Sequence, residues 1–146
     1  MSHLCLRVDL DEPYLVDVGF GDSFLQPLPL SPDRPIDDGN TTYRLIRDGE
    51  YFVLHEDGEA LRPLYQFTLK PRQMEDFEEQ SIRLQTEGTS NFTTNPFATR
   101  SLEGGPDRVT LLSDRLKFRR AGLWSEEPIA FDDWNATAHK WFGFEL

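Results

Sequence analysis

Two residues near the start of the chain, His3 and Asp17, have types and surroundings suited to proton-transfer chemistry. Asp17 interrupts the otherwise apolar run 14–20, and burying a carboxylate there is costly unless it is hydrogen-bonded or paired with a cation. An imidazole that is held by a carboxylate keeps one tautomer and is stabilised in its cationic form. The pair therefore predicts a site that serves a nucleophile.

The two residues can meet only if the segments that carry them form a hairpin. Residues 3–10 alternate between polar and apolar side chains, as a half-buried strand does, and residues 14–20 follow a turn as a second strand. If Cys5 lies opposite Asp17, His3 is one diagonal step away on the same face, about 7 to 8 Å between backbones. An imidazole and a carboxylate can bridge that separation.

Other interpretations of these residues stay open at this point. Asp17 could be a buried carboxylate that backbone donors or Arg7 satisfy, with His3 merely an edge residue or a cloning remnant. Cys5 is the only thiol of the chain and shares the strand parity of His3. We interpret Cys5 as a small buried apolar residue, with a catalytic thiol as the alternative.

The rest of the sequence predicts an α+β fold with mostly antiparallel sheet. Expected strands lie at 41–46, 51–55, 66–69, 96–102, 108–112 and 115–120, a long loop at 27–40, and helices at 74–84 and 131–142. Asp48-Gly49 is the strongest hairpin signal in the chain. We expect the acidic pair Asp132-Asp133 to cap the last helix and Gly143 to end it. At 146 residues, a single compact unit is expected.

Composition excludes several classes of function. The formal net charge of −11, from 26 acidic and 15 basic side chains, disfavours binding to nucleic acid or to an anionic membrane surface. No apolar run approaches the roughly 18 residues that a membrane span needs, and no secretion signal is visible. A single cysteine cannot form an internal disulfide, so we expect a cytoplasmic protein. His55 and His139 lack ligands at metal spacing, so no metal site is expected.

The segment that carries the pair resembles the signature of the arylamine N-acetyltransferases. In that signature a His-led strand, here at 3–8, precedes a strand reading Tyr-Leu-Val-Asp-Val-Gly-Phe-Gly, here at 14–21. Further likenesses follow in the family's order at 27–30, 91–95 and 141–143. The resemblance therefore spans nearly the whole chain.

The resemblance implies a fold and an activity. It implies the cysteine-proteinase-like fold of these enzymes, with a β-barrel-like domain at 1–90 that carries the His and Asp, and an α/β lid domain at 91–146. It implies acetyl transfer from acetyl-coenzyme A to an arylamine or arylhydrazine through a cysteine thioester, without a metal. His3 then resembles the general base and Asp17 the acid that orients it. The related macrolactam amide synthases share this triad and are not separated from the arylamine enzymes by this sequence.

The resemblance also implies binding residues. Gly19, Phe20 and Gly21 resemble the loop beside the acceptor pocket, where glycine permits close backbone approach and Phe20 offers an aromatic face. The alternative for these three is a glycine bulge with a core Phe.

Two sets of residues are candidates for binding coenzyme A. The polar turn at Thr93, Thr94 and Asn95 resembles the one that touches the coenzyme in relatives. The second candidate set is the only basic cluster of the chain, which a solvated strand face explains more simply, and consists of Arg115, Lys117, Arg119 and Arg120.

The chain departs from the family pattern in one respect. Family members carry the nucleophile in an Arg-Gly-Gly-x-Cys motif on an N-terminal helical domain, and this motif does not occur in residues 1–146. A chain that starts inside a strand suggests that something upstream is missing. We therefore expect the truncated, C-terminal part of an acetyltransferase, inactive alone, that binds a missing N-terminal domain or self-associates through an exposed apolar face. The alternative is a nucleophile-free remnant that acts as a binding module.

Overall fold

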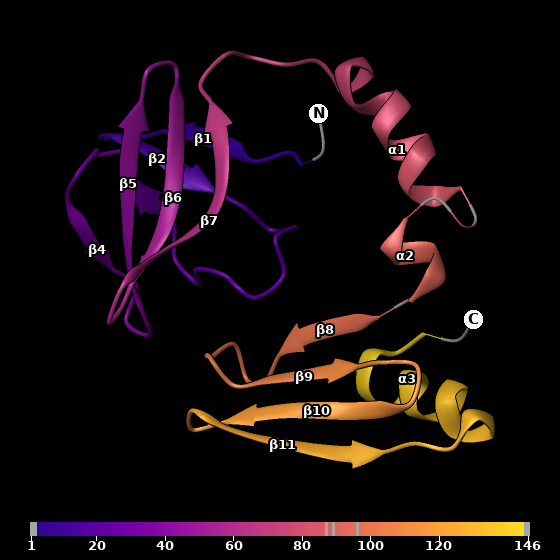
Figure 1. Ribbon diagram of the computed structural model, residues 1–146. Helices are drawn as coiled ribbons and strands as arrows, with labels where there is room; N and C mark the ends of the chain where they lie inside the picture. Colours follow the sequence, from indigo (N-terminus) through magenta and orange to yellow (C-terminus); the bar gives the residue numbers. More distant parts are fainter. Residues whose placement is uncertain (1–2, 87, 89, 96, 145–146) are drawn as a thin grey trace. The chain divides into compact units, whose positions relative to one another are not determined.

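The structure is a computed structural model that describes residues 3–86, 88, 90–95 and 97–144 (Figure 1). The chain forms two compact units, and the boundary between them lies at Met74 and Glu75. The expectation of a single compact unit was therefore wrong, because each unit closes a hydrophobic core of its own.

Antiparallel strands make up the first unit. One sheet has the order β1-β2-β3 and the other the order β4-β5-β6-β7 (Figure 1). The strands are β1 (Leu6–Asp9), β2 (Pro13–Val16), β3 (Leu28–Pro29), β4 (Pro35–Asp37), β5 (Thr42–Asp48), β6 (Tyr51–Asp57) and β7 (Leu61–Thr68). The Asp48-Gly49 pair joins β5 to β6, as its sequence predicts.

The core of the first unit comes from side chains that point inward from alternate strand positions. Its buried members are Leu15, Leu28, Tyr43, Leu45 and Leu54. Because Leu15 in β2 belongs to this core, its neighbours Tyr14 and Val16 face the other side of the sheet. The same alternation places Asp17, one residue past the end of β2, on the side of Leu15.

Several elements differ from their sequence-based predictions. The loop expected at 27–40 contains the short strands β3 and β4, which the prolines there do not prevent because short edge pairings need few ladder bonds. Strand β7 begins at Leu61 rather than at 66. The second strand ends at Val16 rather than at 20, because the Asp17 side chain accepts the hydrogen bonds of the backbone that follows.

The second unit consists of one antiparallel sheet and short helices. Its sheet has the order β11-β10-β9-β8. The strands are β8 (Ala98–Ser101), β9 (Arg108–Leu111), β10 (Arg115–Arg120) and β11 (Leu123–Pro128), and the last of these was not predicted. The helices are a 3₁₀ turn (Met74–Phe77), α1 (Glu78–Gln85), α2 (Asn91–Thr94), a second 3₁₀ turn (Phe131–Asp133) and α3 (Trp134–Phe142).

Helix α3 packs on one face of this sheet. Ala138 of α3 is fully buried among sheet residues that include Val109 and Phe118, and the Trp134 indole donates to the Leu112 carbonyl at 2.9 Å. Gly143 ends the helix at a φ of 78°, as predicted. The predicted cap is wrong, since the acidic pair lies in the 3₁₀ turn and no side chain there caps α3.

The α+β fold with antiparallel sheets is confirmed. Within the described part of the chain, no helix combines the length and the apolarity that crossing a membrane requires.

Candidate active site

His3 and Asp17 are in direct contact in the first unit. The Nε2 atom of His3 lies 2.6 Å from Oδ2 of Asp17. The Asp17 side chain has no exposed surface, whereas the His3 side chain is 31% exposed. With Asp17 ionised, Nε2–H donates and the neutral ring has its lone pair on Nδ1. One ring nitrogen is therefore held by the carboxylate, and the other is the basic atom.

The hairpin brings the pair together in the way that its sequence predicts. Strands β1 and β2 pair with Leu6 opposite Val16, and one further step in this register places Cys5 opposite Asp17. His3 is then the diagonal neighbour of Asp17 on the core side of the sheet. Arg7 instead pairs with Asp9 at the surface, so it is not the partner of Asp17.

Backbone donors complete the environment of Asp17. Its Oδ1 accepts hydrogen bonds from the backbone N–H of Gly19 at 2.9 Å and of Phe20 at 3.1 Å. A buried carboxylate with these donors and an imidazole is satisfied on both oxygens. The bonds also fold residues 17–20 into a turn, which fixes the carboxylate relative to β2.

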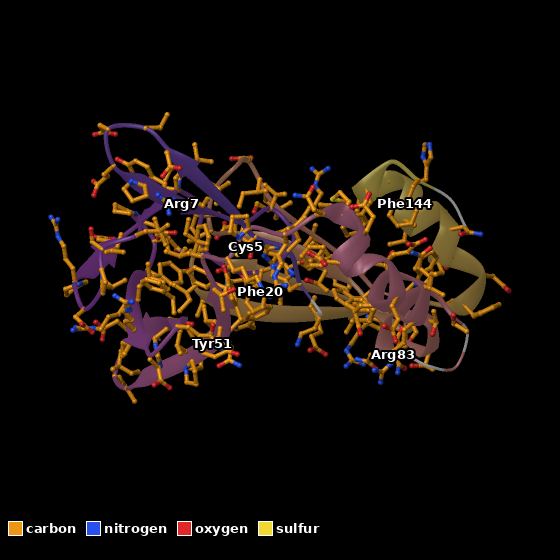
Figure 2. The ribbon with its side chains drawn as sticks, turned by 90° about the horizontal axis from the view of Figure 1, so that it is seen from above. Cys5, Arg7, Phe20, Tyr51, Arg83 and Phe144 are labelled. Carbon is orange, nitrogen blue, oxygen red and sulfur yellow. The ribbon has the colours of Figure 1, made fainter. Side chains whose placement is uncertain are left out.

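Two aromatic rings flank the His3 imidazole. The Phe20 ring lies 5.7 Å from it at 68° and the Tyr65 ring 5.6 Å from it at 61°, both in edge-to-face arrangements. The Phe20 and Tyr65 rings also contact each other at 4.7 Å. Gly19 closes a further side, since a Cβ there would lie 3.4 Å from Cε1 of His3. Figure 2 draws these side chains on the ribbon, with Cys5 and Phe20 labelled.

Tyr65 was not singled out in the sequence, although it lies beside both members of the pair. Its hydroxyl is buried and has no hydrogen-bond partner within the described residues. Burial and the nearby Asp17 carboxylate raise the pKa of Tyr65, so the phenol stays neutral. The alternation of Tyr65 and Phe67 is the only signal in the sequence that could have placed this ring in the core.

Cys5 is a partly buried thiol with the properties of an unreactive one. Burial, and after it the nearby Asp17 carboxylate, raises the pKa of Cys5 to about 11 against the opposing effect of a backbone hydrogen bond. Because the nucleophile in such chemistry is the thiolate, a thiol with this pKa is almost wholly unreactive near neutral pH. Cys5 also packs against the core of the first unit, in agreement with its interpretation as a small apolar residue.

The two glycines of the loop that follows β2 serve different purposes. Gly19 has an ordinary backbone conformation and permits the close approach of His3 described above. Gly21 has a φ of +81° and no atom within 4 Å of its Cβ position, so its backbone conformation, not lack of space, favours glycine. The structure brings Gly19 and Phe20 to the His3 ring, with Gly21 next in the chain.

The residues expected to touch coenzyme A lie in the second unit. Thr93 and Thr94 belong to the four-residue helix α2, and Asn95 follows it. Their side-chain donors make local bonds: both threonine hydroxyls donate to the Ser90 carbonyl, and the Asn95 amide donates to Asn91. Their oxygens remain available as acceptors.

The basic cluster lies along β10 and its groups have local partners. Lys117 and Arg115 both pair with Glu126 on β11, and Arg119 donates to the Pro106 carbonyl. The Trp124 ring lies under the cationic ends of Lys117 and Arg119. This arrangement is that of a solvated strand face.

Acidic and metal-binding side chains do not converge elsewhere. Within residues 3–86, 88, 90–95 and 97–144, no group of three or more His, Cys, Asp and Glu side chains is placed to hold a metal ion.

The comparisons specify the family in which this antiparallel fold and its His–Asp pair occur. The family model described as N-acetyltransferase matches residues 1–146, so the chain belongs to this N-acetyltransferase family. It is 34% identical over 120 residues to arylamine N-acetyltransferase 1 of Homo sapiens, covering 68% of this chain and 41% of that protein.

Solved structures agree with this assignment. The arylamine N-acetyltransferase of M. smegmatis superposes with a TM-score of 0.84 at 28% identity, covering 100% of this chain and 55% of that one. The Mycobacterium marinum enzyme in complex with CoA superposes with a TM-score of 0.83 at 26% identity, covering 98% and 54%. The chain thus spans about half the length of the relatives that it matches.

Proposed function

We propose that this chain is the part of an arylamine N-acetyltransferase that supplies the general base and its orienting acid, His3 and Asp17. The observation that carries the proposal is the 2.6 Å contact between Nε2 of His3 and Oδ2 of Asp17, which leaves Nδ1 as the basic atom. The family membership and the coenzyme A bound to the M. marinum relative support acetyl-coenzyme A as the acyl donor.

The proposed mechanism requires a thiol from outside these 146 residues, since Cys5 is unsuited to it. Nδ1 of His3 takes the proton of that thiol, and Asp17 balances the positive charge of the ring. The thiolate attacks the acetyl carbonyl of acetyl-coenzyme A, and coenzyme A leaves as a thiol with the proton from His3. An arylamine or arylhydrazine nitrogen then attacks the thioester, and His3 carries its proton back to the leaving sulfur.

The binding roles belong to this proposal. Phe20, with Gly19 and Gly21, lines the acceptor pocket, and its edge-to-face contact with His3 supports a place beside the reacting atoms. Thr93, Thr94 and Asn95 contact the coenzyme. Residues 1–90 form the domain that carries the pair and 91–146 the lid. We keep the cytosol as the proposed location because the chain has one thiol and no disulfide.

The test compares the chain alone with the longest polypeptide that its gene encodes. With acetyl-coenzyme A and an arylamine, the chain alone is expected to give background turnover and no acetyl group on Cys5 by intact-protein mass. A longer product that contains an Arg-Gly-Gly-x-Cys motif is expected to turn over. In that product, His3→Gln should lower kcat/KM by about 10³-fold or more.

The matched control is Asp9→Asn, which removes an exposed carboxylate from the same hairpin and is expected to leave kcat/KM unchanged. Acetylation of Cys5 in the chain alone, or full activity of the His3→Gln enzyme, would refute the proposal. The alternative is that the whole enzyme is one of the macrolactam amide synthases, which share the triad. An assay in which a long acyl chain with an amino end replaces the arylamine tests that alternative.

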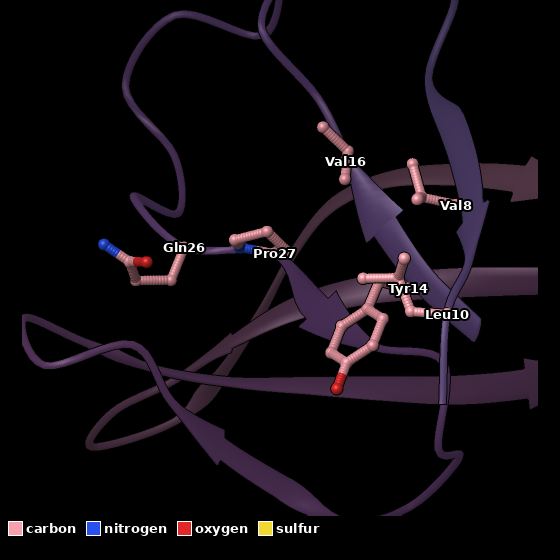
Figure 3. Close-up of a pocket in the computed structure, with 6 residues that line it drawn as sticks. All are labelled: Val8, Leu10, Tyr14, Val16, Gln26 and Pro27. Atoms are coloured by element: carbon pink, nitrogen blue, oxygen red, sulfur yellow. The ribbon is translucent and has the colours of Figure 1, made fainter. Parts of the chain in front are cut away.

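A second candidate function, a nucleophile-free binding module, is favoured by an exposed apolar face. The side of the β1–β2 hairpin that faces away from Leu15 presents Leu6, Leu10 and Val18, which are 49%, 73% and 94% exposed. Between these strands and the following loop lies a hollow of about 310 Å³ (Figure 3). The residues that line it are Val8, Leu10, Tyr14, Val16, Gln26 and Pro27.

Sequencing the gene upstream of Met1 separates the two candidates. An in-frame Arg-Gly-Gly-x-Cys motif supports the enzyme, and a stop codon in frame before Met1 supports the binding module. For the module, sedimentation should show self-association that Leu10→Lys abolishes. If the stop codon is present, and the wild-type chain and the Leu10→Lys variant both sediment as monomers, the binding-module proposal is contradicted.

A further inference from the structure

The orientation of the His3 ring requires an explanation from tertiary contacts. His3 lies three residues before the first paired residue of β1, Leu6, so the strand ladder does not hold it. The hydrogen bond to Asp17 fixes one ring atom only, and a ring tethered at Nε2 can still swing about that bond. The remaining contacts of the ring are therefore decisive for where Nδ1 points.

Besides Gly19, those contacts are two aromatic rings from different elements. Phe20 comes from the turn that Asp17 organises, and Tyr65 comes from β7. They meet the imidazole at 5.7 and 5.6 Å and meet each other at 4.7 Å, so the three rings form one cluster. Edge-to-face pairs of this kind are favoured beyond the effect of area burial, because the positive edge of one ring meets the negative face of the other.

An irregularity in β7 is what turns Tyr65 toward this cluster. From the hairpin end, Asp57 pairs with Leu61 and His55 with Pro63, but the next pair is Leu54 with Tyr65. Leu64 is thus an extra residue on β7, which is a β-bulge.

If the hairpin register continued without a bulge, Leu64 would lie opposite Leu54 and Tyr65 opposite Val53. Leu54 is fully buried in the core, whereas Val53 is its neighbour on the opposite side of β6. A one-residue shift moves every later side chain to the other face of the sheet. The bulge therefore transfers Tyr65 from the outer side to the side of His3.

We propose that Tyr65 is a positioning residue for His3. With Phe20 it clamps the imidazole so that Nε2 meets Asp17 and Nδ1 stays free, and the Leu64 bulge is the backbone feature that places it there. This deepens the proposed function, because it names what orients the proposed base. The clamp is assigned to the Tyr65 ring, which touches the imidazole, and Tyr65→Phe separates the ring from its hydroxyl, which lies near the Asp17 carboxylate.

The test reads the His3 ring nitrogens directly, by long-range ¹H–¹⁵N NMR of the ¹⁵N-labelled chain at alkaline pH, with His55 and His139 as internal references. The wild-type chain is expected to show a single neutral tautomer for His3, with the proton on Nε2. Tyr65→Phe keeps the ring and should keep this tautomer. Tyr65→Leu should give a mixture of tautomers and broadened His3 signals.

Phe24→Leu is the matched control. Phe24 packs against the same core, and its ring contact is with Tyr43 rather than with His3. This variant loses a core aromatic and is expected to leave the His3 tautomer unchanged. Unchanged His3 signals in Tyr65→Leu, or an equal change in Phe24→Leu, would overturn the proposal.

Two further measurements apply if Tyr65→Leu does not fold. Phe20→Leu loosens the other side of the clamp and is expected to mix the tautomers too; an unchanged spectrum counts against the clamp. Cross-strand NOEs in the wild-type chain test the bulge, with Leu54 to Tyr65 expected and Val53 to Tyr65 contradicting it. None of these measurements depends on turnover. The proposed function can therefore be refuted while the positioning role of Tyr65 is supported, and the positioning role can be refuted while the proposed function is supported.

Discussion

Gly19 lies against the His3 imidazole, with its Cβ position 3.4 Å from Cε1 of His3 and 3.8 Å from Oδ1 of Asp17. These separations are ordinary van der Waals contacts, and the backbone of Gly19 is not in the left-handed region. A methyl group therefore fits at Gly19 but fills the space beside the ring. Gly19 and Gly21 of this loop should therefore respond differently to substitution, one through the His3 ring and the other through stability.

Gly19→Ala is expected to change the His3 ring and to change stability by less than about 1 kcal/mol. Gly21→Ala is expected to cost about 1–2 kcal/mol, because its φ of +81° strains any residue with a Cβ. Urea unfolding measures both free energies, and histidine ring NMR measures the first effect. Gly58→Ala is the control, with open space and no positive φ. A larger stability loss in Gly19→Ala than in Gly21→Ala would contradict this assignment.

Removing the Asp17 carboxylate should be strongly destabilising. Asp17→Ala leaves the N–H groups of Gly19 and Phe20 and the His3 ring without their acceptor, and we expect a loss of about 2–3 kcal/mol in unfolding free energy. Asp9→Ala removes an exposed ion pair with Arg7 and should cost less than about 1 kcal/mol. Equal losses in the two variants would show that the buried network does not stabilise the fold.

The Cys5 thiol should resist alkylation. With a pKa of about 11, its thiolate fraction at pH 8 is small, so reaction with iodoacetamide should be about tenfold or more slower than that of free cysteine. Mass spectrometry over time gives the rate, and the same chain in urea is the control, where the ordinary rate should return. A native rate equal to the unfolded rate would contradict burial of the thiol.

The same pKa shift predicts a loss of stability at alkaline pH. The folded pKa of Cys5, about 11, exceeds the ordinary value of 9.0, so the folded chain holds this proton more tightly than the unfolded chain. This contribution is complete below about pH 9 and is lost as the pH rises toward 11. Cys5→Ala should therefore show a flatter decline of unfolding free energy over that window. An identical slope in both chains would argue against the shift.

The core of the first unit predicts a large contrast between two apolar substitutions. Leu54→Ala removes a fully buried side chain and should cost about 2–5 kcal/mol. Val18→Ala changes a side chain that is 94% exposed and should cost less than about 0.5 kcal/mol. Far-UV circular dichroism in urea is the suitable probe, because all three tryptophans lie after Glu75, in the second unit. Similar costs at the two positions would mean that Leu54 is not a core residue.

Much of the site could be predicted from local pattern. The alternation in residues 3–10 and the single carboxylate in an apolar run predict the hairpin, its register and the contact of His3 with Asp17. These features depend on residues close in the chain, where strand periodicity and turn chemistry act directly. The early end of β2 was missed because the Asp17 side chain competes with the ladder for backbone donors, and such local competition leaves no periodic signal.

The sequence by itself determined the antiparallel α+β fold, the pairing of β1 with β2 and the facing positions of His3 and Asp17. Only the tertiary structure decided that Tyr65 meets His3, that the pKa of Cys5 is raised, and that the chain closes two cores. The physical reason is that the position of a β-bulge, the burial of a side chain and the closing of a core all depend on which distant segments pack together. A strand pattern of period two specifies the faces of each strand but not the partner that each face meets.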